Sequence, residues 1–199
     1  MIVDNIQVYG FAESVVASGL PMRKDYDSSV FESQTLGMCV DDDSVHMLRA
    51  NRLSSFATGS GHCNFLSGIV VQMNITATVK WWEQWQRYHF QQIVSSQSTM
   101  HMLRKMMSEG TIRFNEKTNP TVIAEFLKLK DDATITDEQL AYSCPMGLEL
   151  TARVSTNYLQ LRTIFTQRRH HKLQEWHDFI DFIKALPCAE ECILACADK

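Results

Sequence analysis

Hydrophobic and polar residues alternate along two early segments of the chain, and both segments therefore predict β-strands. Residues 2–10 alternate with the period of two that a half-buried strand shows. Residues 65–78 are rich in Ile, Val and Thr, which favour strands, and a Thr-Gly-Ser-Gly turn at 58–61 comes shortly before them. Between these segments, residues 13–18 predict a short helix that Gly19 and Pro21 end.

A helical period replaces this alternation from residue 79 onward. Trp82, Trp85, His89 and Ile93 recur at three and four residues, which predicts a helix over 79–94 that buries these side chains. The Ser- and Gln-rich segment 94–99 has weak helix propensity and is expected to break or kink that helix. A Met-rich piece follows, and further helices are expected over four later segments: 121–130, 136–142, 146–169 and 173–185.

These elements predict an α+β fold in which helix dominates. Prolines and glycines are dispersed and no repeat or linker is visible, so residues 1–199 are expected to form a single domain. The polar segment 22–45 is expected to be rich in loops. The sequence leaves open whether this segment becomes ordered only when a ligand binds.

Composition excludes several classes of protein. With 45% hydrophobic and 21% charged residues, the chain is neither disordered nor fibrous. Its formal net charge of −4 gives no general attraction to nucleic acid or to an anionic membrane, so a local basic cluster must hold any anion. Six cysteines are too few for a dense disulfide framework and predict reduced thiols. With no spanning stretch or signal peptide visible, we expect a cytoplasmic protein with no membrane or nucleic-acid partner.

The predicted helix over 146–169 carries two stripes of side chains at helical spacing. The apolar stripe holds Leu150, Val154, Tyr158, Leu161 and Phe165. The adjacent polar stripe holds Arg153, Asn157, Gln160, Ile164 and Arg168. Aligned arginine and amide groups can donate several hydrogen bonds to one ligand that carries phosphate or carbonyl oxygens. A solvent-facing surface beside a core-facing one explains the pattern equally well.

A second polar face arises if helical stepping continues beyond residue 94, and it holds Gln84, Arg87, Gln91, Ser95 and Ser98. Free backbone N–H groups at the break over 94–99 would suit an oxyanion or phosphate, and an ordinary polar turn is the alternative. The basic cluster at 168–172 (Arg-Arg-His-His-Lys) either caps a helix C-terminus or recognises phosphate or carbonyl groups.

Three cysteines near the C-terminus recur every four residues: Cys188, Cys192 and Cys196. Zinc sites prefer closer pairs and a fourth ligand, so this spacing favours small apolar packing, with a metal site as the weaker alternative. The common sequence motifs of nucleotide-binding and hydrolase sites do not occur in the chain.

Taken in order, several segments resemble the flavin-dependent thymidylate synthase family. Residues 58–64 (Thr-Gly-Ser-Gly-His-Cys-Asn) are similar to the family's Gly-His-x-Ser/Thr segment before a strand. Residues 84–89 (Gln-Trp-Gln-Arg-Tyr-His) stand where the family carries Gln-x-x-Arg-His-Arg, and 94–101 stand where Asn-Glu-x-Ser-x-Arg-Tyr follows. Asn157, Arg168 and Trp176 are similar to its C-terminal pattern. The resemblance covers most of the chain apart from about 108–145.

This resemblance implies a helix-dominant fold with a small, mostly antiparallel sheet and a methyltransferase-like activity. Such an enzyme binds FAD and uses NADPH and methylenetetrahydrofolate to methylate C5 of a pyrimidine deoxynucleotide such as dUMP. Another pyrimidine or a related one-carbon modification stays open. The resemblance also implies a homotetramer with sites formed between subunits. The many Trp and Met side chains between 81 and 107 separately predict a homo-oligomer, because one helix cannot easily bury them all.

Carried over by position, the resemblance assigns two sets of residues. Flavin contacts are implied for His62, Asn64, Arg87, Asn157 and either His170 or His171. The pyrimidine nucleotide is implied to contact Gln84, Arg87, Ser98, Arg153 and Arg168. Arg168 is the implied catalytic residue, because the matching arginine increases the electrophilic character of the ring.

The sequence also departs from the family's motifs at several charged positions. Tyr88 and His89 replace a His and an Arg. Leu159 replaces an arginine that stands two residues after the family's flavin-contacting Asn, which is matched here by Asn157. The motif's Glu becomes Ser95 or Ser96, and its late Arg becomes Thr99 or Met100. These losses leave an alternative of another class, a non-catalytic nucleotide-binding or assembly protein that retains the fold.

Overall fold

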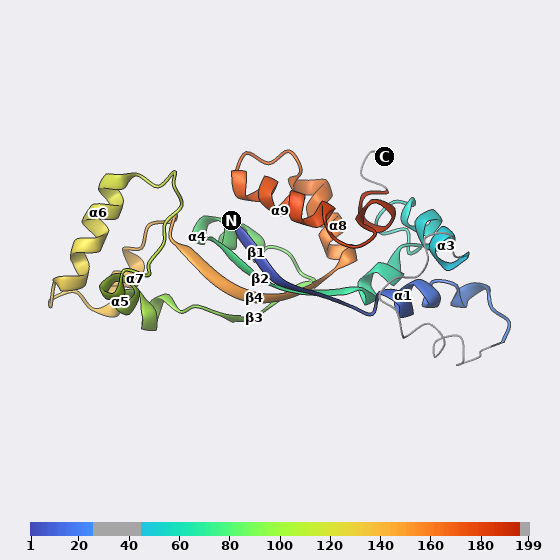
Figure 1. Ribbon diagram of the computed structural model, residues 1–199, viewed down its shortest axis with the longest axis horizontal. Coiled ribbons are helices and arrows are strands. Elements are labelled where there is room, and N and C mark those ends of the chain that lie inside the picture. The colour runs from blue at the N-terminus through green and yellow to red at the C-terminus, as the bar shows by residue number, and fades with distance from the viewer. Residues whose placement is uncertain (26–44, 196–199) are drawn as a thin grey trace. The chain divides into compact units, whose positions relative to one another are not determined.

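The computed structural model describes residues 1–25 and 45–195, and it combines one four-stranded sheet with predominantly helical connections (Figure 1). The strands are β1 (Ile2–Tyr9), β2 (Val70–Thr78), β3 (Gln91–Ser96) and β4 (Glu149–Asn157). The predicted helix-dominant α+β class is therefore confirmed. No helix within the described ranges is long and apolar enough to cross a lipid bilayer.

The sheet has the order β1-β2-β4-β3, and hydrogen bonds fix an antiparallel register between neighbouring strands. Between β2 and β4, the N–H of Tyr158 donates to the carbonyl of Ile69, and the N–H of Val79 donates to that of Leu148. Alternate residues of β2 are buried, as a strand with one core face requires: Val71, Met73, Ile75 and Ala77. The expected small antiparallel sheet is thus present.

The chain divides into two compact units, and each unit takes a section of every strand. Unit 1 comprises residues 1–4, 74–89 and 93–154. Unit 2 comprises residues 5–73, 90–92 and 155–199, of which 26–44 and 196–199 lie outside the described residues. Each unit has its own core, and the expectation of a single domain stays a prediction.

Four helices belong to unit 1: α4 (Val79–Trp85), α5 (Thr99–Glu109), α6 (Pro120–Lys128) and α7 (Asp137–Tyr142). A short 3-10 turn, η3 (Leu129–Asp131), follows α6. Side-chain caps start these helices where the sequence supplies hydroxyl or amide groups, and Thr136 forms a full capping box with Gln139 at α7. Apolar residues from α5, α6, α7 and the start of β4 share one core: Leu103, Met107, Phe126, Leu140 and Leu148.

The tryptophans of α4 form an aromatic cluster inside unit 1. The rings of Trp81 and Trp85 stack with centroids 5.0 Å apart, and Trp82 meets Trp81 edge-on at the same distance. All three side chains are buried in the chain itself. The argument that so many apolar groups need an oligomer is therefore wrong for the tryptophans, although Met100 and Met102 are exposed.

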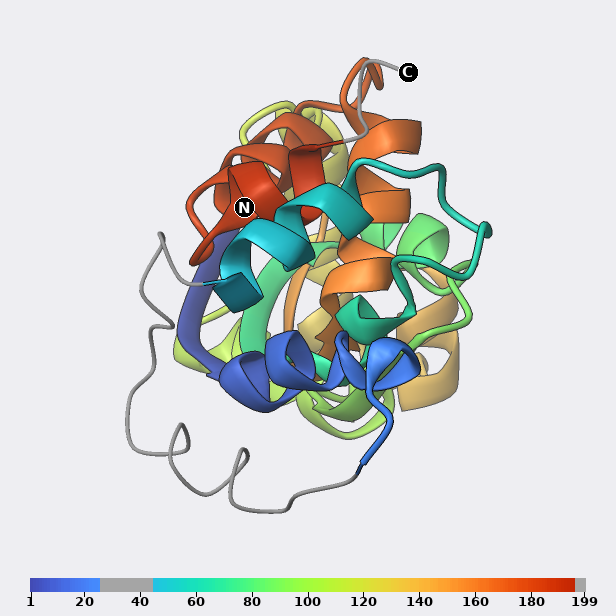
Figure 2. The ribbon, with the colours of Figure 1, turned by 90° about the vertical axis from the view of Figure 1, so that its right-hand side faces the viewer.

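Among its described residues, unit 2 contains the helices α1 (Phe11–Ala17), α3 (Val45–Ser54), α8 (Tyr158–Arg168) and α9 (Gln174–Lys184) (Figure 2). Shorter turns are η1 (Leu20–Met22), η2 (Asn64–Gly68) and the π-helical η4 (Glu190–Leu194). Helix α8 packs against η2, α9 and η4 and so forms the centre of the unit.

Two glycines allow the chain to turn from β1 into α1. Gly10 has a φ of 68°, a left-handed conformation that a glycine adopts at little cost. A Cβ atom on Gly10 would lie 2.7 Å from the carbonyl oxygen of Gly68 at the end of η2. The backbone of Gly68 cannot move away as a flexible side chain could, so position 10 requires glycine on two grounds.

The predicted long helix over 146–169 is wrong, because its first half is the strand β4 and only its second half is the helix α8. Ala152, Val154 and Thr156 are buried in alternation, which is the period of a strand. Asn157 then caps α8, where its side-chain oxygen accepts a hydrogen bond from the N–H of Gln160 at 2.9 Å. The two stripes therefore do not exist as helical stripes, and Arg153 is not on α8.

The predicted helix over 79–94 is also wrong beyond Trp85. Helix α4 ends there, and residues 91–96 form the edge strand β3. His89, expected in the core, is exposed, and Gln91, Ser95 and Ser98 do not share a helical face with Gln84. Pairing of β3 with β4 accounts for the change. Just before β3, the carbonyl of Phe90 accepts a hydrogen bond from the hydroxyl of Thr156 on β4 at 3.1 Å.

Other predictions hold with small changes of boundary. Strand β1, helix α9 and the helices α6 and α7 lie where periodicity places them, whereas the strand expected over 65–78 begins only at Val70, after η2. Helix α3 was not predicted. Most of the segment 22–45, and Cys196, lie outside the described residues.

A first prediction concerns Arg104 of α5, which ties α5 to the connection between α6 and α7. Its guanidinium donates to the carboxylate of Asp137 at 3.0 Å and to the carbonyls of Lys130 and Ile135 at 2.6 and 2.7 Å. We expect Arg104→Met to lower the free energy of unfolding by about 2 kcal/mol, because hydrogen bonds to charged groups are strong. The adjacent Lys105 makes only an exposed contact of 3.9 Å with Glu109, so Lys105→Met should change stability little. Equal effects of both substitutions in urea unfolding would contradict this role.

A second prediction concerns Tyr158, whose hydroxyl donates to the carbonyl of Pro187 at 2.7 Å. Burial raises the pKa of Tyr158 well above its ordinary value. Above pH about 10 the unfolded chain therefore releases a proton that the folded chain keeps, and stability present below that pH is lost as pH rises. The buried Cys192, with a pKa raised to about 12, acts in the same direction at somewhat lower pH.

We expect Tyr158→Phe to lose less stability than the unsubstituted chain when pH is raised from about 8 to about 11, measured by urea unfolding. Tyr142 is exposed and provides the matched control, so Tyr142→Phe should keep the full pH dependence. If Tyr158→Phe kept the same dependence, ionisation of Tyr158 would not be linked to folding.

Candidate functional site

The residues singled out from the sequence fall into two sets that lie in different units. Unit 2 contains His62, Asn64, Asn157, Arg168 and His170, and unit 1 contains Gln84, Arg87, Ser98 and Arg153. Each set is described separately below, beginning with the one around α8.

Asn157 stands at the point where β4 becomes α8. Its side-chain oxygen is used by the helix cap, which leaves its amide nitrogen to donate to a ligand. Next to it, Thr156 and Gln160 hold both peptide groups of Phe90. The Thr156 hydroxyl donates to the Phe90 carbonyl, and the Gln160 side chain accepts from the Phe90 N–H at 3.1 Å. The start of α8 is therefore rigidly held.

The loop that carries His62 and Asn64 is anchored to the middle of α8 by Arg162. The guanidinium of Arg162 donates to the carbonyl of Phe56 at 2.8 Å, and the Phe56 ring contacts the imidazole of His62 with centroids 4.5 Å apart. Asn64 begins η2, which packs on α8. The structure thus brings His62, Asn64 and Asn157 to the same part of unit 2, with both His62 and Asn64 exposed.

Arg162 itself is buried, with 2% of its surface exposed. Within the described residues its second terminal nitrogen, Nη1, has no hydrogen-bond partner. The guanidinium lies near Cys192 and favours its thiolate, but burial is the larger effect and raises the pKa of Cys192 to about 12. This thiol is therefore protonated at neutral pH and does not act as a nucleophile.

Arg168 ends α8, and its guanidinium lies 4.8 Å from the centre of the Trp176 ring on α9. This cation–π contact orients the side chain at the surface of the unit. Arg169 points to a different ring, that of Phe165, at 6.0 Å. Consecutive arginines at the end of the helix therefore have different surroundings, as the rotation of about 100° per residue requires.

The two adjacent histidines also differ. The Nδ1 of His171 accepts the N–H of Leu173 at 3.1 Å, and its carbonyl oxygen lies 2.6 Å from Nε2 of His177. Burial, and then the neighbouring Arg168 and His177, lower the pKa of His171. His171 thus helps to form the turn before α9, whereas His170 is exposed.

Arg168 and Asn157 lie at opposite ends of α8. Eleven residues at ~1.5 Å per residue place them ~16 Å apart along the helix axis. A small ligand cannot contact both residues of one chain, whereas an extended ligand that runs along α8 can. The polar stripe predicted from helical spacing therefore becomes two separate positions at the ends of a shorter helix.

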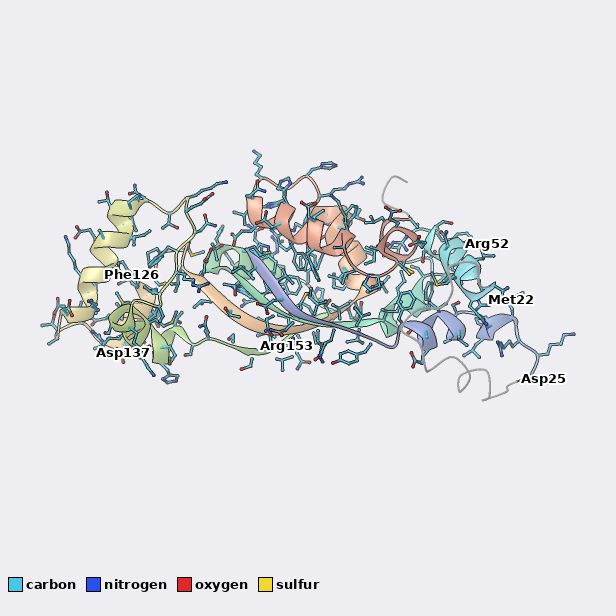
Figure 3. The ribbon with its side chains drawn as sticks, in the orientation of Figure 1. Met22, Asp25, Arg52, Phe126, Asp137 and Arg153 are labelled. Atoms are coloured by element: carbon cyan, nitrogen blue, oxygen red, sulfur yellow. The ribbon has the colours of Figure 1, made fainter. Side chains whose placement is uncertain are left out.

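The predicted residues of unit 1 have mixed surroundings. Gln84 is half-buried in α4, and Arg87 is exposed in the turn that follows. Ser98 caps α5 by accepting the N–H of His101 at 3.3 Å. Arg153 lies on β4 (Figure 3) and donates to the side chain of Asn74 at 3.3 Å, which in turn donates to Asp4 at 3.0 Å. The structure therefore gives Arg153 a role within a polar ladder on the sheet.

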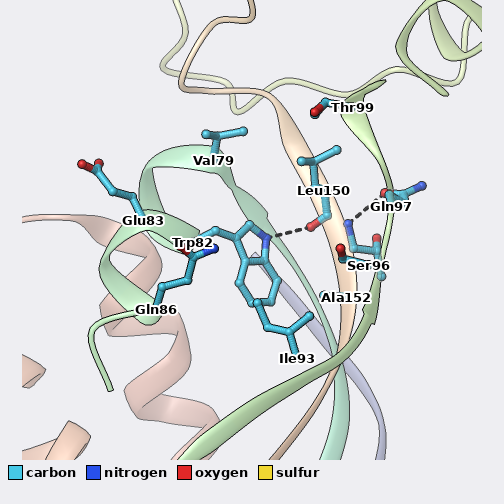
Figure 4. A pocket seen from close by; sticks show the side chains of 11 residues that line it. Val79, Trp82, Glu83, Gln86, Ile93, Ser96, Gln97, Thr99, Leu150 and Ala152 are labelled. Carbon is cyan, nitrogen blue, oxygen red and sulfur yellow. Dashed lines mark hydrogen bonds between the residues drawn. The ribbon is translucent and has the colours of Figure 1, made fainter. Parts of the chain in front are cut away.

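A pocket in unit 1 was not predicted from the sequence. It has a volume of about 330 Å³ and lies between α4, the end of β3 and β4 (Figure 4). Its lining includes Glu83, Gln86, Gln97 and Thr99, which are sequence neighbours of the predicted Gln84, Arg87 and Ser98. A prediction of one continuous helix over 79–94 could not reveal it, because the pocket exists only where β3 returns past α4.

Metal-ligating side chains do not gather in the described part of the chain. No group of three or more His, Cys, Asp or Glu side chains in residues 1–25 and 45–195 is arranged to hold a metal ion. Cys188 lies in the turn before η4 and Cys192 lies within η4. The N–H of Cys192 donates to the carbonyl of Cys188 at 3.0 Å, and the Cys192 side chain packs in the core.

Comparison with known proteins gives structural matches without sequence matches: no family model and no curated protein matches the chain. Thymidylate synthase X from Helicobacter pylori, solved with FAD and dUMP, matches with a TM-score of 0.67 and 16% identity over 100% of both chains. A second Helicobacter pylori structure, a flavin-dependent thymidylate synthase complexed with FAD and dUMP, has the same TM-score and identity over 98% of this chain and 100% of that one.

A third solved structure is a UMP/dUMP methylase, PolB from Streptomyces cacaoi, bound with 5-Br dUMP. It matches with a TM-score of 0.67 and 11% identity, over 98% of this chain and 95% of its own. The matches extend over nearly the whole length of each chain. The chain therefore has the fold of the flavin-dependent thymidylate synthases.

Proposed function

We propose that this chain is a flavin-dependent enzyme that transfers a one-carbon unit to C5 of a pyrimidine deoxynucleotide such as dUMP. In this proposal FAD is the cofactor, and methylenetetrahydrofolate and NADPH are co-substrates. The observation that carries the proposal is the full-length likeness to solved structures with bound FAD and dUMP, together with a dUMP methylase of the same fold.

The residues around the first half of α8 fit a flavin. His62, Asn64 and Asn157 are exposed or half-buried and offer imidazole and amide donors, which suit the carbonyl oxygens of a flavin ring. The anchoring of the His62 loop through Phe56 and Arg162 keeps these donors in place without the ligand. Bound FAD would supply the hydride and one-carbon transfer chemistry that no side chain provides.

Arg168 is the residue we assign to activation of the pyrimidine. A guanidinium presents a planar fork of N–H donors that can contact two acceptors at fixed geometry. The Arg168 guanidinium lies 4.8 Å from the centre of the Trp176 ring, a cation–π contact that orients the side chain. Donation to a pyrimidine carbonyl draws electron density from the ring and favours attack at its carbon atoms. Arg87, exposed after α4, is assigned to the nucleotide or the flavin.

The proposed enzyme is a cytoplasmic homotetramer in which subunits share their sites. Support comes from the sequence resemblance and from exposed apolar side chains on α5, namely Met100 and Met102.

A second candidate function is supported by Tyr88. It stands where the resemblance expects a histidine, and it is buried with its ring 6.4 Å from that of Trp85. Tyr88 therefore belongs to the aromatic cluster of unit 1 and contributes packing. Together with Leu159 in place of an arginine, this favours a protein that binds nucleotide without catalysing its modification.

A third prediction separates these candidates through FAD itself. We expect the purified chain to bind FAD and to show its absorbance at ~450 nm, which belongs to the cofactor. Asn157→Asp should keep the α8 cap, because aspartate caps helices as well as asparagine, but it removes the amide donor. FAD affinity should then fall about tenfold, the effect of losing one hydrogen bond to a ligand, with the thermal midpoint unchanged.

The matched control for this experiment is Asn119→Asp. Asn119 caps α6 in the same way, by accepting the N–H of Thr121 at 2.9 Å. It should change neither FAD affinity nor stability. Protein that stays colourless with added FAD but binds dUMP would support the non-catalytic candidate, and equal FAD affinity in both variants would remove Asn157 from the flavin site.

A fourth prediction concerns Arg168. We expect Arg168→Lys to keep the fold and FAD binding but to lower turnover by ~10²–10³-fold, the usual effect of losing one electrostatic stabiliser. Arg169→Lys should be nearly silent, since Arg169 lies over Phe165 instead of Trp176. The measurement is dUMP-dependent oxidation of NADPH by the two variants. Equal rates would mean that the basic cluster at the end of α8 acts only as a helix cap.

A further inference from the structure

The pocket of unit 1 has an apolar floor built around Trp82 (Figure 4). The indole Nε1 of Trp82 donates to the carbonyl of Leu150 at 3.0 Å, which fixes the ring between α4 and β4. Val79, Ile93 and Leu150 supply the other large apolar groups of the lining. A volume of about 330 Å³ is at the lower end of the range for ligand pockets and suits a single nucleoside, not a dinucleotide.

The polar groups of the lining are amides and hydroxyls. Gln86, Ser96 and Thr99 can each donate and accept a hydrogen bond, so they can pair with a ring edge that alternates carbonyl and N–H groups. The side-chain oxygen of Gln97 already has a partner within the chain. It accepts a hydrogen bond from the N–H of Thr151 at 2.8 Å and continues the pairing of β3 with β4. The lining therefore combines an apolar floor with an uncharged polar rim.

The charge of the lining distinguishes this pocket from a phosphate site. Among its 11 lining residues, all within the described chain, Glu83 is the one charged side chain. Its carboxylate is paired with the ammonium of Lys80 at 2.7 Å, outside the lining. Phosphate recognition in proteins relies on charge-assisted donors such as arginine. A phosphate group entering this pocket would lose water and gain no such donor.

We propose that this pocket binds an uncharged pyrimidine nucleoside and discriminates against the corresponding nucleotide. The apolar part of the ring packs beside Trp82 and Ile93, and its imide edge meets the amide of Gln86 and the hydroxyls of Ser96 and Thr99. The choice of a pyrimidine rests on the proposed function, whereas the exclusion of phosphate rests on the lining alone.

The test is calorimetric titration of the full chain with deoxyuridine and with dUMP, two probes that differ only in the phosphate. The unsubstituted chain should bind deoxyuridine at this pocket at least about tenfold more tightly than dUMP. Gln86→Leu, which removes both hydrogen-bonding groups of an exposed side chain, should weaken deoxyuridine binding about tenfold. Binding of dUMP at any other site is insensitive to this substitution.

A cation introduced into the lining should reverse the preference. Thr99→Arg replaces the Thr99 hydroxyl with a guanidinium at the first residue of α5, and we expect the ratio of dUMP affinity to deoxyuridine affinity to rise by about 10- to 100-fold. Thr121→Arg is the matched control, because Thr121 is an exposed residue in the first turn of α6 and does not line the pocket. It should alter neither affinity.

Three outcomes would overturn the inference: no deoxyuridine binding, deoxyuridine binding that Gln86→Leu leaves unchanged, or dUMP binding that Gln86→Leu weakens equally. FAD uptake, measured separately by absorbance, decides the proposed function. A chain that binds FAD but not deoxyuridine disproves the pocket assignment alone, and a colourless chain that binds deoxyuridine at the pocket disproves the flavin enzyme alone.

Discussion

The buried guanidinium of Arg162 is the interaction on which unit 2 depends. A charged group removed from water is costly unless its hydrogen bonds are replaced, and here the carbonyl of Phe56 replaces one of them. This bond joins the centre of α8 to a loop more than a hundred residues earlier in the chain. Without this bond the buried guanidinium would lose a hydrogen bond that water does not replace, so the loop and the helix are held in one arrangement.

The position of α8 in turn sets the geometry of the candidate flavin site. Its first residue follows Asn157 directly, its middle holds the His62 loop, and its end carries Arg168 against Trp176. All three candidate positions lie on α8 itself or on elements packed against it. The unit therefore resembles a scaffold in which a single rigid element determines the spacing of groups that come from separate parts of the sequence.

Much of this arrangement was predictable where one hydrophobic period was unambiguous. The alternation in β1 and the strong helical pattern of α9 gave correct elements, whereas residues 149–157 fit both periods. Leu150 and Val154 are four apart, as in a helix, but Ala152 between them is also buried, as in a strand. The sequence pattern does not predict helix α3, because its buried positions are Met47, Ala50 and Ser54, of which only Met47 is strongly apolar. Candidate residues could be named, but the pocket could not, because it forms where residues 93–99 return as a strand past α4 and meet β4, whereas the sequence predicts one helix over 79–94.

The close approach of Gly10 to the backbone of Gly68 limits which residues position 10 can accept. Most positions in a fold can drift because a neighbouring side chain can shrink or turn aside, but here one backbone faces another. No second substitution can compensate for a side chain at position 10, since the obstacle is a carbonyl that every residue at 68 would carry. Any chain that makes this passage from β1 into α1 is therefore expected to need glycine at this position, because no change of side chain at 68 removes the obstacle.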